Sequence, residues 1–240
     1  PLTDFHAVPF RQLHHTASAV ALVGGGGQPR PGEVSLAHHG VLFLDELPEF
    51  DRRGLEGLRE PLESGEVCIS RAARQAHFPA DFQLIAAMNP CPCGYLGDAE
   101  KSCGYFCEKA RRYQQKLSGP LLDRIDLHVD VPAIKADELL NQPMGETSQT
   151  ARQRVLSARE RQLARQGCLN GMLDGKALEH ELGDLGPWLA QVVERLKLSA
   201  RAVHRSIRVA RTLADLTNSE CVEQSHLKEA LGFRSQLSQR

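Results

Sequence analysis

The sequence lacks the features that mark membrane and secreted proteins. None of its apolar runs approaches the roughly 18 consecutive residues that suggest a membrane span. It also lacks a signal peptide, which would combine a basic start with an apolar core. We therefore expect a soluble protein that has no membrane partner.

The chain also has little excess charge of either sign. Its 240 residues carry a net charge of -1, which argues against a protein coated in positive charge but leaves room for local basic elements. Its 7 cysteines are odd in number and unevenly spaced, which is not typical of a secreted disulfide framework. The reducing cytoplasm is therefore the expected compartment.

What the sequence does contain first is a pattern of strands and helices. Continuous apolar runs at residues 41–44, 82–88 and 127–131 predict strands that are buried on both faces. Leucines at helical spacing after the first run predict a helix that Gly65 ends. Strands alternating with a helix favour an α/β layer fold, which we assign to residues 1–140.

The second part of the chain favours helices alone. Residues 141–150 are polar, contain Pro143 and Gly145, and are predicted to be a linker. Ser199 is of a type that caps helices, and a helix is expected to follow it. We therefore expect a small all-α domain over residues 151–240. The other predicted helices cover residues 151–166, 187–196 and 225–231.

A pair of carboxylates directly follows the first apolar run. Ligands of open α/β sheets bind beyond the carboxyl ends of the strands, so Asp45 and Glu46 would face a ligand there. Asp45 is predicted to hold Mg²⁺, through water, because Mg²⁺ prefers oxygen ligands. Glu46 is predicted to orient or deprotonate the water that attacks a γ-phosphate. A surface turn that contains both acids is the alternative.

Two further polar residues extend this pattern. Asn89 follows the second apolar run, where its amide could position the same water molecule. Arg124 could reach the nucleotide of a neighbouring subunit and stabilise the developing phosphate charge. The alternatives are an ordinary Asn-Pro turn and a surface ion pair of Arg124 with Asp123 or Asp126.

Four of the cysteines gather in one short stretch. Cys91, Cys93, Cys103 and Cys107 offer four thiolates, and zinc binds such sets in tetrahedral geometry. The spacing of the first pair is tighter than the usual gap of zinc ligands. Zinc bound by these four residues and four free thiols therefore remain as alternatives.

Arginines lie at the turn of a predicted hairpin, whose strands are residues 66–71 and 77–82. Arg71 and Arg74 could grip DNA phosphates without reading sequence, and a solvated turn is the equal alternative. The histidine pairs at 14–15 and 38–39 show no acidic partner at useful spacing. We therefore expect them to have a structural role rather than to bind a metal.

Long stretches of the sequence resemble the ComM/YifB family of magnesium-chelatase-like competence proteins. The resemblance covers nearly the whole chain, and the length of the matching stretches makes it specific. Among them are His14–Ser18, Gly24–Gly26, Pro31–His38, Gly40–Phe50, Leu84–Gly94, Ser118–Asp126 and Leu198–Ala202.

The resemblance implies an AAA+ core with a P-loop-NTPase-type parallel sheet, followed by a helical lid, in a hexameric ring. It implies that Asp45 and Glu46 are the Walker B pair, that Asn89 is sensor 1 and that Arg124 is the arginine finger. Arg201 resembles the sensor 2 arginine, with a solvated helix face as the alternative. It also implies that the family uses Mg²⁺ and ATP to move along or remodel DNA, including branch migration in natural transformation.

The phosphate-binding loop G-x-x-x-x-G-K-[ST] of such ATPases does not occur in the 240 residues. The resemblance implies that this loop and its strand lie upstream of Pro1. We therefore expect a fragment with an incomplete sheet that binds ATP weakly or not at all by itself. Two alternatives to a DNA motor are a chelatase-type ATPase that acts on a protein partner and a non-catalytic zinc-binding interaction module.

Overall fold

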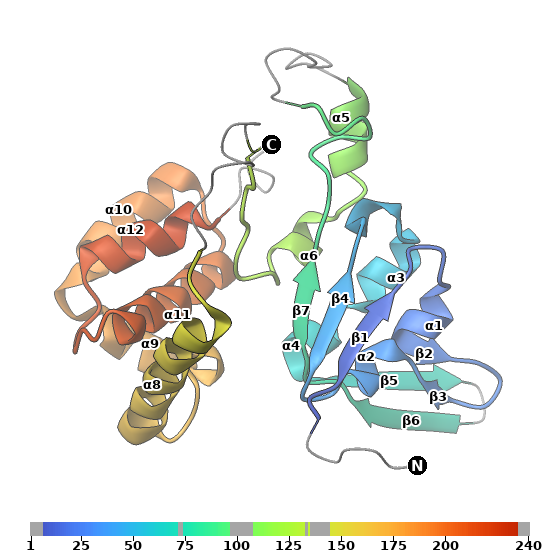
Figure 1. Cartoon of the computed structure of the whole chain (residues 1–240), viewed down its shortest axis with the longest axis horizontal. Helices are drawn as coiled ribbons and strands as arrows, with labels where there is room; N and C mark the ends of the chain where they lie inside the picture. The colour runs from blue at the N-terminus through green and yellow to red at the C-terminus, as the bar shows by residue number, and fades with distance from the viewer. Residues whose placement is uncertain (1–6, 72–73, 97–107, 133, 135–144, 235–240) are drawn as a thin grey trace. The chain divides into compact units, whose positions relative to one another are not determined.

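The structure is a computed structural model, and it describes residues 7–71, 74–96, 108–132, 134 and 145–234. The chain divides into two compact units, Pro1–Ile125 and Asp126–Arg240. Figure 1 shows strands with short helices in the first unit and helices in the second. Among the described residues, none of the helices combines the length and the apolar character needed to cross a membrane.

A parallel sheet of three strands forms the centre of the first unit, as in an AAA+-like α/β fold (Figure 1). Its order is β1 (Phe10–Leu13), β4 (Val41–Leu44) and β7 (Gln83–Ala86), with β4 in the middle. The sequence predicts β4 with these bounds, and β7 lies inside the predicted strand at residues 82–88. β1 is absent from the sequence prediction because it is short and partly polar.

Burial alternates along the central strand. Leu42 and Leu44 are fully buried, whereas Val41 and Phe43 are half-buried. The prediction of strands buried on both faces is therefore wrong for β7, of which only Leu84 is even half-buried, and is met only in part by β4. One face of the sheet forms the core of the unit, while the other is only partly covered by the described residues.

Short helices accompany the sheet, among them α1 to α4 and α6 (Gly119–Leu122), and α1 packs against both α2 and α3. A single helix was expected to run as far as Gly65, but two form, because Pro61 lacks the backbone N–H needed to continue a helix and instead begins a new one. Gly65 ends the second of them at a φ of 73°, as predicted. The first four helices are α1 (Ala19–Val23), α2 (Glu33–Leu36), α3 (Arg52–Gly57) and α4 (Pro61–Ser64).

Two antiparallel hairpins complete the strands of the first unit. The small one pairs β2 (Gly24–Gly25) with β3 (Arg30–Pro31). The larger one pairs β5 (Glu66–Arg71) with β6 (Arg74–Pro79) and lies beside the amino ends of the parallel strands (Figure 1). Its second strand begins three residues before the predicted start at residue 77.

The predicted strand at residues 127–131 does not form, and that prediction is wrong. Leu127, Val129 and Val131 are 49%, 66% and 84% exposed. Among the described residues no strand pairs with this segment, and an isolated strand leaves its backbone N–H and C=O groups without ladder partners. The apolar pattern is therefore present without the neighbour that would make it a strand.

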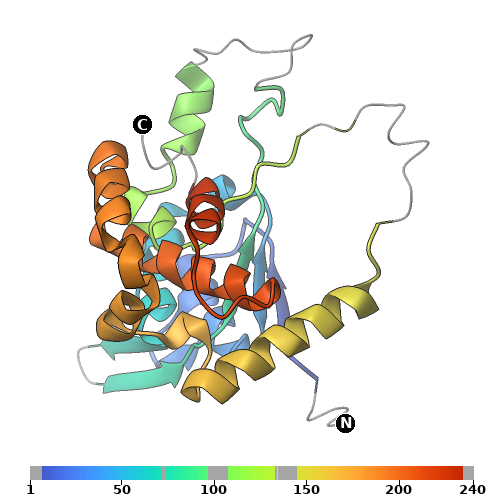
Figure 2. The same ribbon diagram turned by 90° about the vertical axis from the view of Figure 1, so that its left-hand side faces the viewer.

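The second unit is built from helices around one apolar core. α11 packs against α8, α9 and α12, and Ser199 caps it by accepting a hydrogen bond from the backbone N–H of Ala202. Figure 2 shows α8 along its whole length, with its first turns extending beyond the other helices of this unit. The helices are α8 (Ser148–Gln166), α9 (Gly175–Leu182), α10 (Gly186–Leu196), α11 (Ala200–Leu216) and α12 (Gln224–Gly232).

These helices confirm the predicted all-α character of the second unit. The sequence pattern did not predict α9. The core residues are Leu173, Leu178, Leu189, Ile207, Ala210, Val222, Leu227 and Ala230. α8 begins inside the predicted linker at residues 141–150. Because residues 135–144 lie outside the described part, the exact division between the two predicted domains stays a prediction.

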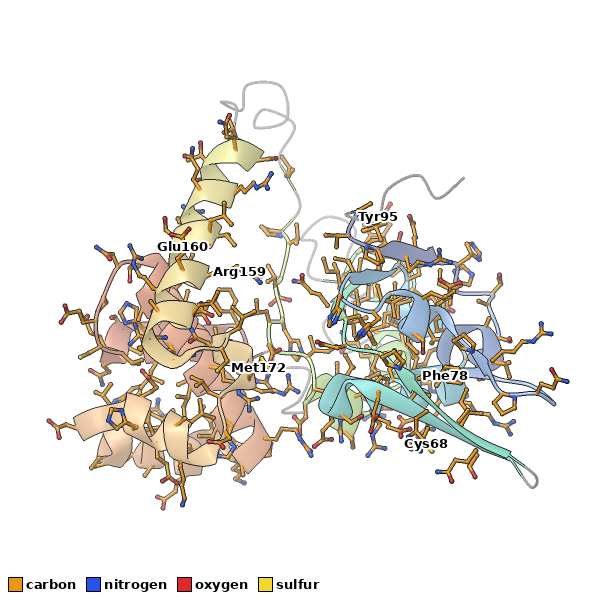
Figure 3. The ribbon with its side chains drawn as sticks, turned by 90° about the horizontal axis from the view of Figure 1, so that it is seen from below. Cys68, Phe78, Tyr95, Arg159, Glu160 and Met172 are labelled. Carbon is orange, nitrogen blue, oxygen red and sulfur yellow. The ribbon has the colours of Figure 1, made fainter. Side chains whose placement is uncertain are left out.

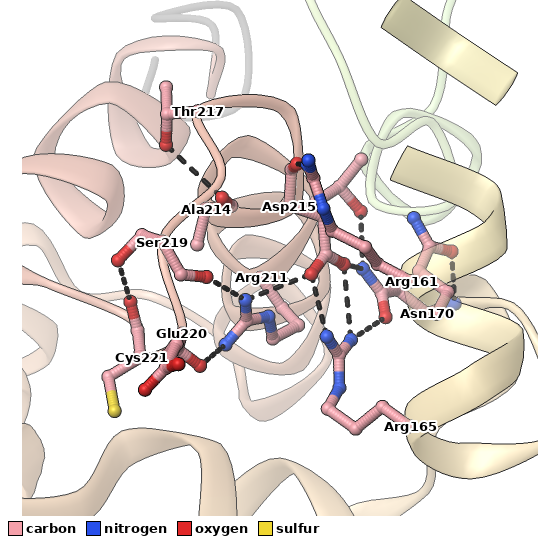
Figure 4. A network of polar contacts seen from close by, with 12 residues as sticks. Arg161, Arg165, Asn170, Arg211, Ala214, Asp215, Thr217, Ser219, Glu220 and Cys221 are labelled. Carbon is pink, nitrogen blue, oxygen red and sulfur yellow. Dashed lines mark hydrogen bonds and ion pairs between the residues drawn. The ribbon is translucent and has the colours of Figure 1, made fainter. Parts of the chain in front are cut away.

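A buried polar network joins α8, α11 and the turn at Asn170 (Figure 4). Arg211 and Asp215 are both 1% exposed and pair at 2.9 Å between Nη2 and Oδ1. Arg165 Nη1 donates to Asp215 Oδ1 at 2.6 Å, and Asn170 Nδ2 donates to Oδ2 at 2.8 Å. Burial raises the pKa of Asp215, but the hydrogen bonds from Arg165 and Asn170 and the charge of Arg211 outweigh it, so the pKa lies below its ordinary value.

Candidate functional site

The carboxyl ends of β4 and β7 meet at one edge of the sheet, which we call the carboxyl edge and define by His15, Asp45, Glu46 and Asn89. The two strands are parallel, and Leu44 pairs with Ala86 in the last register position. Beyond the strands, the N–H of Ala87 donates to the carbonyl oxygen of Leu44 at 2.9 Å. The pairing therefore brings the acidic pair and the segment that leads to Asn89 to the same edge.

Asp45 and Glu46 leave the sheet through a tight turn. Glu46 has a φ of 52° and a ψ of 45°, a left-handed conformation that costs a non-glycine residue on the order of 1 kcal/mol. Its backbone N–H donates to Asp45 Oδ1 at 2.9 Å, and a 3₁₀ helix follows at Leu47–Glu49. Both acidic residues and Asn89 are exposed, so oxygen ligands of the type that Mg²⁺ prefers are accessible at this edge.

The carboxylate of Glu46 is bound by a histidine from the turn that follows the neighbouring strand. His15 follows β1 by two residues, and its Nδ1 lies 2.8 Å from Glu46 Oε2. His39 similarly lies 3.7 Å from Asp81. One histidine of each pair thus has an acidic neighbour that the spacing in the sequence did not reveal, and the structural role expected of the pairs stays a prediction. Recognising β1 in the sequence would have placed His15 beside the acidic pair.

Helix α5 (Glu108–Gln114) packs beside the loop that follows β7. Gln114 Nε2 donates to the carbonyl oxygen of Pro90 at 2.9 Å, and Lys116 Nζ pairs with Glu49 at 3.0 Å. Tyr113 is buried; its burial and then the nearby carboxylates of Glu49 and Glu46 raise its pKa. This segment therefore has a packing face toward the carboxyl edge rather than a fully solvated basic surface.

The described part of the cysteine cluster is a close pair. Cys91 is buried, Cys93 is exposed, and their Sγ atoms lie 3.1 Å apart. Cys103 and Cys107 lie outside the described residues. Within the part of the chain that the structure describes, no group of three or more His, Cys, Asp or Glu residues could hold a metal ion. A four-cysteine zinc site stays a prediction.

Arg124 is held inside its own unit. Its side chain is 8% exposed, forms an ion pair with Glu63 and donates through Nη1 to the carbonyl oxygen of Pro120 at 2.7 Å. The described ionic partner is thus Glu63, whereas the sequence suggested Asp123 or Asp126; Asp126 pairs with Arg205. The predicted action on a neighbouring subunit would require this arginine to leave Glu63.

Arg201 lies in the first turn of α11 and its side chain is exposed. The next arginines along this helix are anchored: Arg205 pairs with Asp126 at 2.5 Å. Arg208 Nη2 donates to the carbonyl oxygen of Leu173 at 2.7 Å. Arg201 therefore differs from these two arginines in burial, since it is exposed whereas Arg205 and Arg208 are half-buried.

The tip of the larger hairpin carries the two arginines predicted to contact DNA. Arg71 and Arg74 form the last register pair of β5 and β6, next to the turn. The turn residues and the side chains of these arginines lie outside the described part. Nearer the base, Cys68 Sγ lies 3.8 Å from His77 Nε2, and Figure 3 labels Cys68 and Phe78 on the two strands.

Comparison with protein families gives two matches that together cover most of the chain. The model described as magnesium chelatase, subunit ChlI, matches residues 2–139. The model described as the C-terminal part of the same subunit matches residues 145–234.

Individual proteins give similar results. The chain is 50% identical over 232 residues to competence protein ComM of Haemophilus influenzae and 47% identical over 233 residues to protein YifB of Escherichia coli. Both alignments cover 95% of this chain but 45% of the relative, so the chain spans slightly less than half of either protein. A more distant match is the DNA replication licensing factor Mcm6 of Drosophila pseudoobscura, 24% identical over 83% of this chain and 25% of that protein.

Proposed function

The chain belongs to the magnesium chelatase ChlI-like family, and on this premise we propose that it is part of an AAA+ ATPase motor that remodels DNA. The observation that carries the proposal is the carboxyl edge, where Asp45 and Glu46 follow the central strand beside the segment leading to Asn89. Exposed carboxylates and an amide at the ends of parallel strands suit a nucleotide bound with Mg²⁺. ATP and Mg²⁺ are therefore the proposed ligands.

Each residue of this edge has a separate proposed role. Asp45 holds Mg²⁺, which when bound neutralises phosphate charge. Glu46 accepts a proton from the attacking water or orients that water, and Asn89 positions it through its amide. The described edge contributes oxygens but no phosphate-binding loop, so the remaining contacts to the nucleotide are proposed to come from the rest of the full-length protein.

Two arginines are proposed to respond to the nucleotide from other places. Arg124 acts on the nucleotide of the adjacent subunit in a homo-hexameric ring, after it separates from Glu63. Arg201 approaches the nucleotide of its own subunit from the lid helix α11. Both would stabilise negative charge that develops on the transferred phosphoryl group.

The proposed target of the motor is single-stranded or branched DNA in the cytoplasm. Arg71 and Arg74 at the hairpin tip would contact phosphates without reading sequence. One relative is named a competence protein and another a DNA replication licensing factor. These names support DNA as the target, with branch migration during natural transformation as the specific activity proposed.

The test uses the full-length protein and measures ATP hydrolysis with and without DNA. We expect DNA to stimulate hydrolysis, and Glu46→Gln to lower kcat by about 100-fold to 10,000-fold, the range for loss of a general base. Glu49→Gln is the matched control, since Glu49 lies in the following 3₁₀ helix and pairs with Lys116. Equal losses in both variants, or full activity of Glu46→Gln, would contradict the assigned role.

A second candidate is a chelatase-type ATPase motor that acts on a protein partner. It is favoured by the family models, both of which describe a magnesium chelatase subunit. The two candidates share the ATPase site and differ in the target. ATP hydrolysis by the full-length protein that is unaffected by DNA, together with no DNA binding at low salt, would favour the protein-directed motor.

Zinc is proposed as an additional ligand of this chain. If zinc is bound but ATP is not hydrolysed, the third candidate function is a non-catalytic, zinc-binding interaction module. The observation behind it is the 3.1 Å approach of the Cys91 and Cys93 sulfur atoms, which lie close enough to share one ion. Metal analysis of protein purified without chelator should find one zinc per chain, and Cys93→Ser should lower that content. Partner binding without nucleotide would favour the non-catalytic module over the motor.

A further inference from the structure

We propose that Cys68, Gln75 and His77 form a reactive-thiol site, at which the Cys68 sulfur exchanges with small-molecule disulfides. The three side chains lie on the larger hairpin, on which Figure 3 labels Cys68. Cys68 pairs with His77 in the register of β5 and β6, and Gln75 lies two residues before His77. The exchange chemistry does not depend on the proposed function, whereas its effect on DNA binding rests on it.

The alternation of side chains along the hairpin places this cluster on its open face. Successive side chains of a strand point to opposite faces. Val67 and Ile69 are 1% and 7% exposed, so they belong to the covered face. Cys68 lies between them on the other face, where it is half-buried, and both Gln75 and His77 are exposed. A small molecule in solution can therefore reach the cluster.

The contacts of the sulfur atom suit a thiol that loses its proton. Gln75 Nε2 donates to Cys68 Sγ at 3.1 Å, and His77 Nε2 lies 3.8 Å from the same sulfur. Gln75 Nε2 also lies 3.4 Å from His77 Nε2. An amide nitrogen acts only as a donor, so His77 Nε2 is the acceptor in this contact and carries a lone pair. That lone pair can take the thiol proton, and the Gln75 amide then stabilises the thiolate.

Two other cysteines provide an internal comparison. Cys168 is half-buried beside the apolar core of the second unit, and Cys221 is exposed. Among the described residues, neither of these sulfur atoms has a histidine nitrogen or a side-chain amide as a hydrogen-bonding partner, whereas Cys68 has both. Exposure alone would make Cys221 the most reactive of the three thiols. The contacts predict instead that Cys68 reacts fastest.

The exchange needs only the small disulfide as oxidant. His77 accepts the thiol proton, and the Cys68 thiolate attacks one sulfur of the disulfide. The S–S bond of the small molecule breaks as the mixed disulfide forms. The other half leaves as a thiolate, which takes the proton from His77. Cys68 is thereby oxidised, and half of the small molecule is released as a reduced thiol.

The attached group would lie close to the arginines proposed to contact DNA. Arg71 follows Cys68 by three residues on β5, which is about 10 Å along a strand. This distance is comparable to the length over which salt at about 0.1 M screens a charge. The charge of the attached group is therefore expected to alter DNA binding at the hairpin tip.

The first experiment treats the chain with oxidised glutathione and follows the adduct on each cysteine-containing peptide by mass spectrometry. We expect Cys68 to be modified about tenfold faster than Cys168 or Cys221, the effect of hydrogen bonds that favour its thiolate. Modification of Cys68 that is no faster than that of Cys221 would overturn the proposal.

Substitutions separate the effect of the cluster from that of exposure. His77→Ala should slow the modification of Cys68 about tenfold, and Gln75→Leu about fivefold. Both substituted side chains are exposed, so the hairpin should stay folded. His39→Ala is the matched control, because His39 is an exposed histidine of the same unit, and it should leave the rate unchanged. Unchanged rates in both His77→Ala and Gln75→Leu would overturn the assigned roles.

The second experiment measures DNA binding by the full-length protein before and after modification, using fluorescence anisotropy. The glutathione adduct adds one net negative charge and should weaken binding about twofold to threefold, an effect that disappears in high salt. Cystamine attaches a positively charged group by the same reaction and should not weaken binding. Cys68→Ser should be unaffected by either reagent. Equal weakening by both reagents, or weakening of Cys68→Ser by glutathione, would overturn an effect of charge at this site.

The outcomes also separate this inference from the proposed function. If the full-length protein binds no DNA in either state, the proposed function fails, while fast exchange at Cys68 still supports the thiol site. If DNA is bound but Cys68 reacts no faster than Cys221, the proposed function stands and the thiol site fails.

Discussion

The two units of this chain use charged residues in opposite ways. In the first, Asp45 and Glu46 are exposed at the end of a strand, and Glu46 has one described side-chain partner. In the second, Arg211 and Asp215 are 1% exposed and embedded in a network of hydrogen bonds. Exposed, sparsely paired charge is available to a ligand, whereas buried charge that is paired within a network maintains the fold.

Arg124 combines features of both cases, because its own side chain is buried whereas its partner is exposed. Its side chain is 8% exposed, as buried as a structural charge, but its partner Glu63 is 48% exposed. Separation of this pair would therefore not leave the Glu63 carboxylate as a buried charge. Burial of one partner alone therefore does not identify a structural ion pair; the environment of both partners decides what separation costs.

The largest expected effect is on the buried network. Asp215→Ala leaves Arg211 and Arg165 without their shared carboxylate and should lower the free energy of unfolding of the second unit by about 3–5 kcal/mol. Urea unfolding followed by the fluorescence of Trp188, the single tryptophan, reports on this unit. Glu160→Ala, a change on the exposed face of α8 labelled in Figure 3, should have almost no effect. Equal losses of stability in Asp215→Ala and Glu160→Ala would contradict the distinction between buried and exposed charge.

The next effect concerns Arg124 and is expected in activity rather than stability. Arg124→Ala in the full-length protein should lower kcat about 1,000-fold, the lower end of the range for an arginine finger. Its folded stability should change by less than about 1 kcal/mol, because Glu63 is half exposed.

Mixing two inactive proteins tests whether Arg124 acts across a subunit boundary. A mixture of Arg124→Ala and Glu46→Gln subunits should recover part of the activity, because some interfaces then combine an intact Glu46 with an intact Arg124 of the neighbour. If the mixture recovers no ATPase activity and Arg124→Ala loses much of its stability, Arg124 has a structural role, as the buried charges of the second unit do.

A smaller effect is expected at the hairpin tip. Changing Arg71 and Arg74 to Ala should weaken DNA binding by the full-length protein about tenfold. The slope of log binding constant against log salt concentration should become shallower by about one for each lost phosphate contact. Fluorescence anisotropy with labelled single-stranded DNA over a range of salt concentrations measures both. Changing Arg52 and Arg53, exposed arginines on α3, controls for the loss of two positive charges. The same loss in the control would indicate a general charge effect.

The smallest expected effect is the dependence of the second unit's stability on pH. It is absent near neutral pH and develops only in acid. The pKa of Asp215 lies below its ordinary value of 3.8 in the folded state. The unfolded state therefore binds this proton more readily, so the stabilisation is complete above the ordinary value and is lost as the pH falls through the folded pKa. The difference in urea midpoint between wild type and Asp215→Asn should shrink as the pH is lowered below 3.8; a constant difference would contradict it.

Local sequence signals were sufficient for much of the fold. The apolar run at Val41–Leu44 gave the central strand with its observed bounds, and Ser199 gave the cap of α11. The segment at residues 127–131 has an equally good apolar pattern but forms no strand, because a strand also requires a neighbour that supplies ladder hydrogen bonds. β1 was missed for the opposite reason, since pairing with β4 stabilises a segment whose own pattern is weak.

In the candidate site, too, some features follow from local sequence patterns and others from contacts between distant residues. Asp45, Glu46 and Asn89 could be selected from the sequence because polar residues abruptly follow apolar runs. The contact of His15 with Glu46 could not, since 31 positions separate the two residues and only the pairing of β1 with β4 brings them together. The partner of Arg124 was likewise unpredictable, because Glu63 precedes it by 61 positions and lies on helix α4.

Sequence patterns alone were enough to assign the family of this protein, the alternation of strands and helices in its first unit, the helical character of its second and the acidic pair that follows the central strand. Which apolar segments became strands, and which charges are paired, depended on contacts that exist only in the folded chain. The physical reason is that helical periodicity, caps and turns act over a few residues, whereas ladder hydrogen bonds and ion pairs such as His15–Glu46 depend on residues brought together from distant parts of the chain.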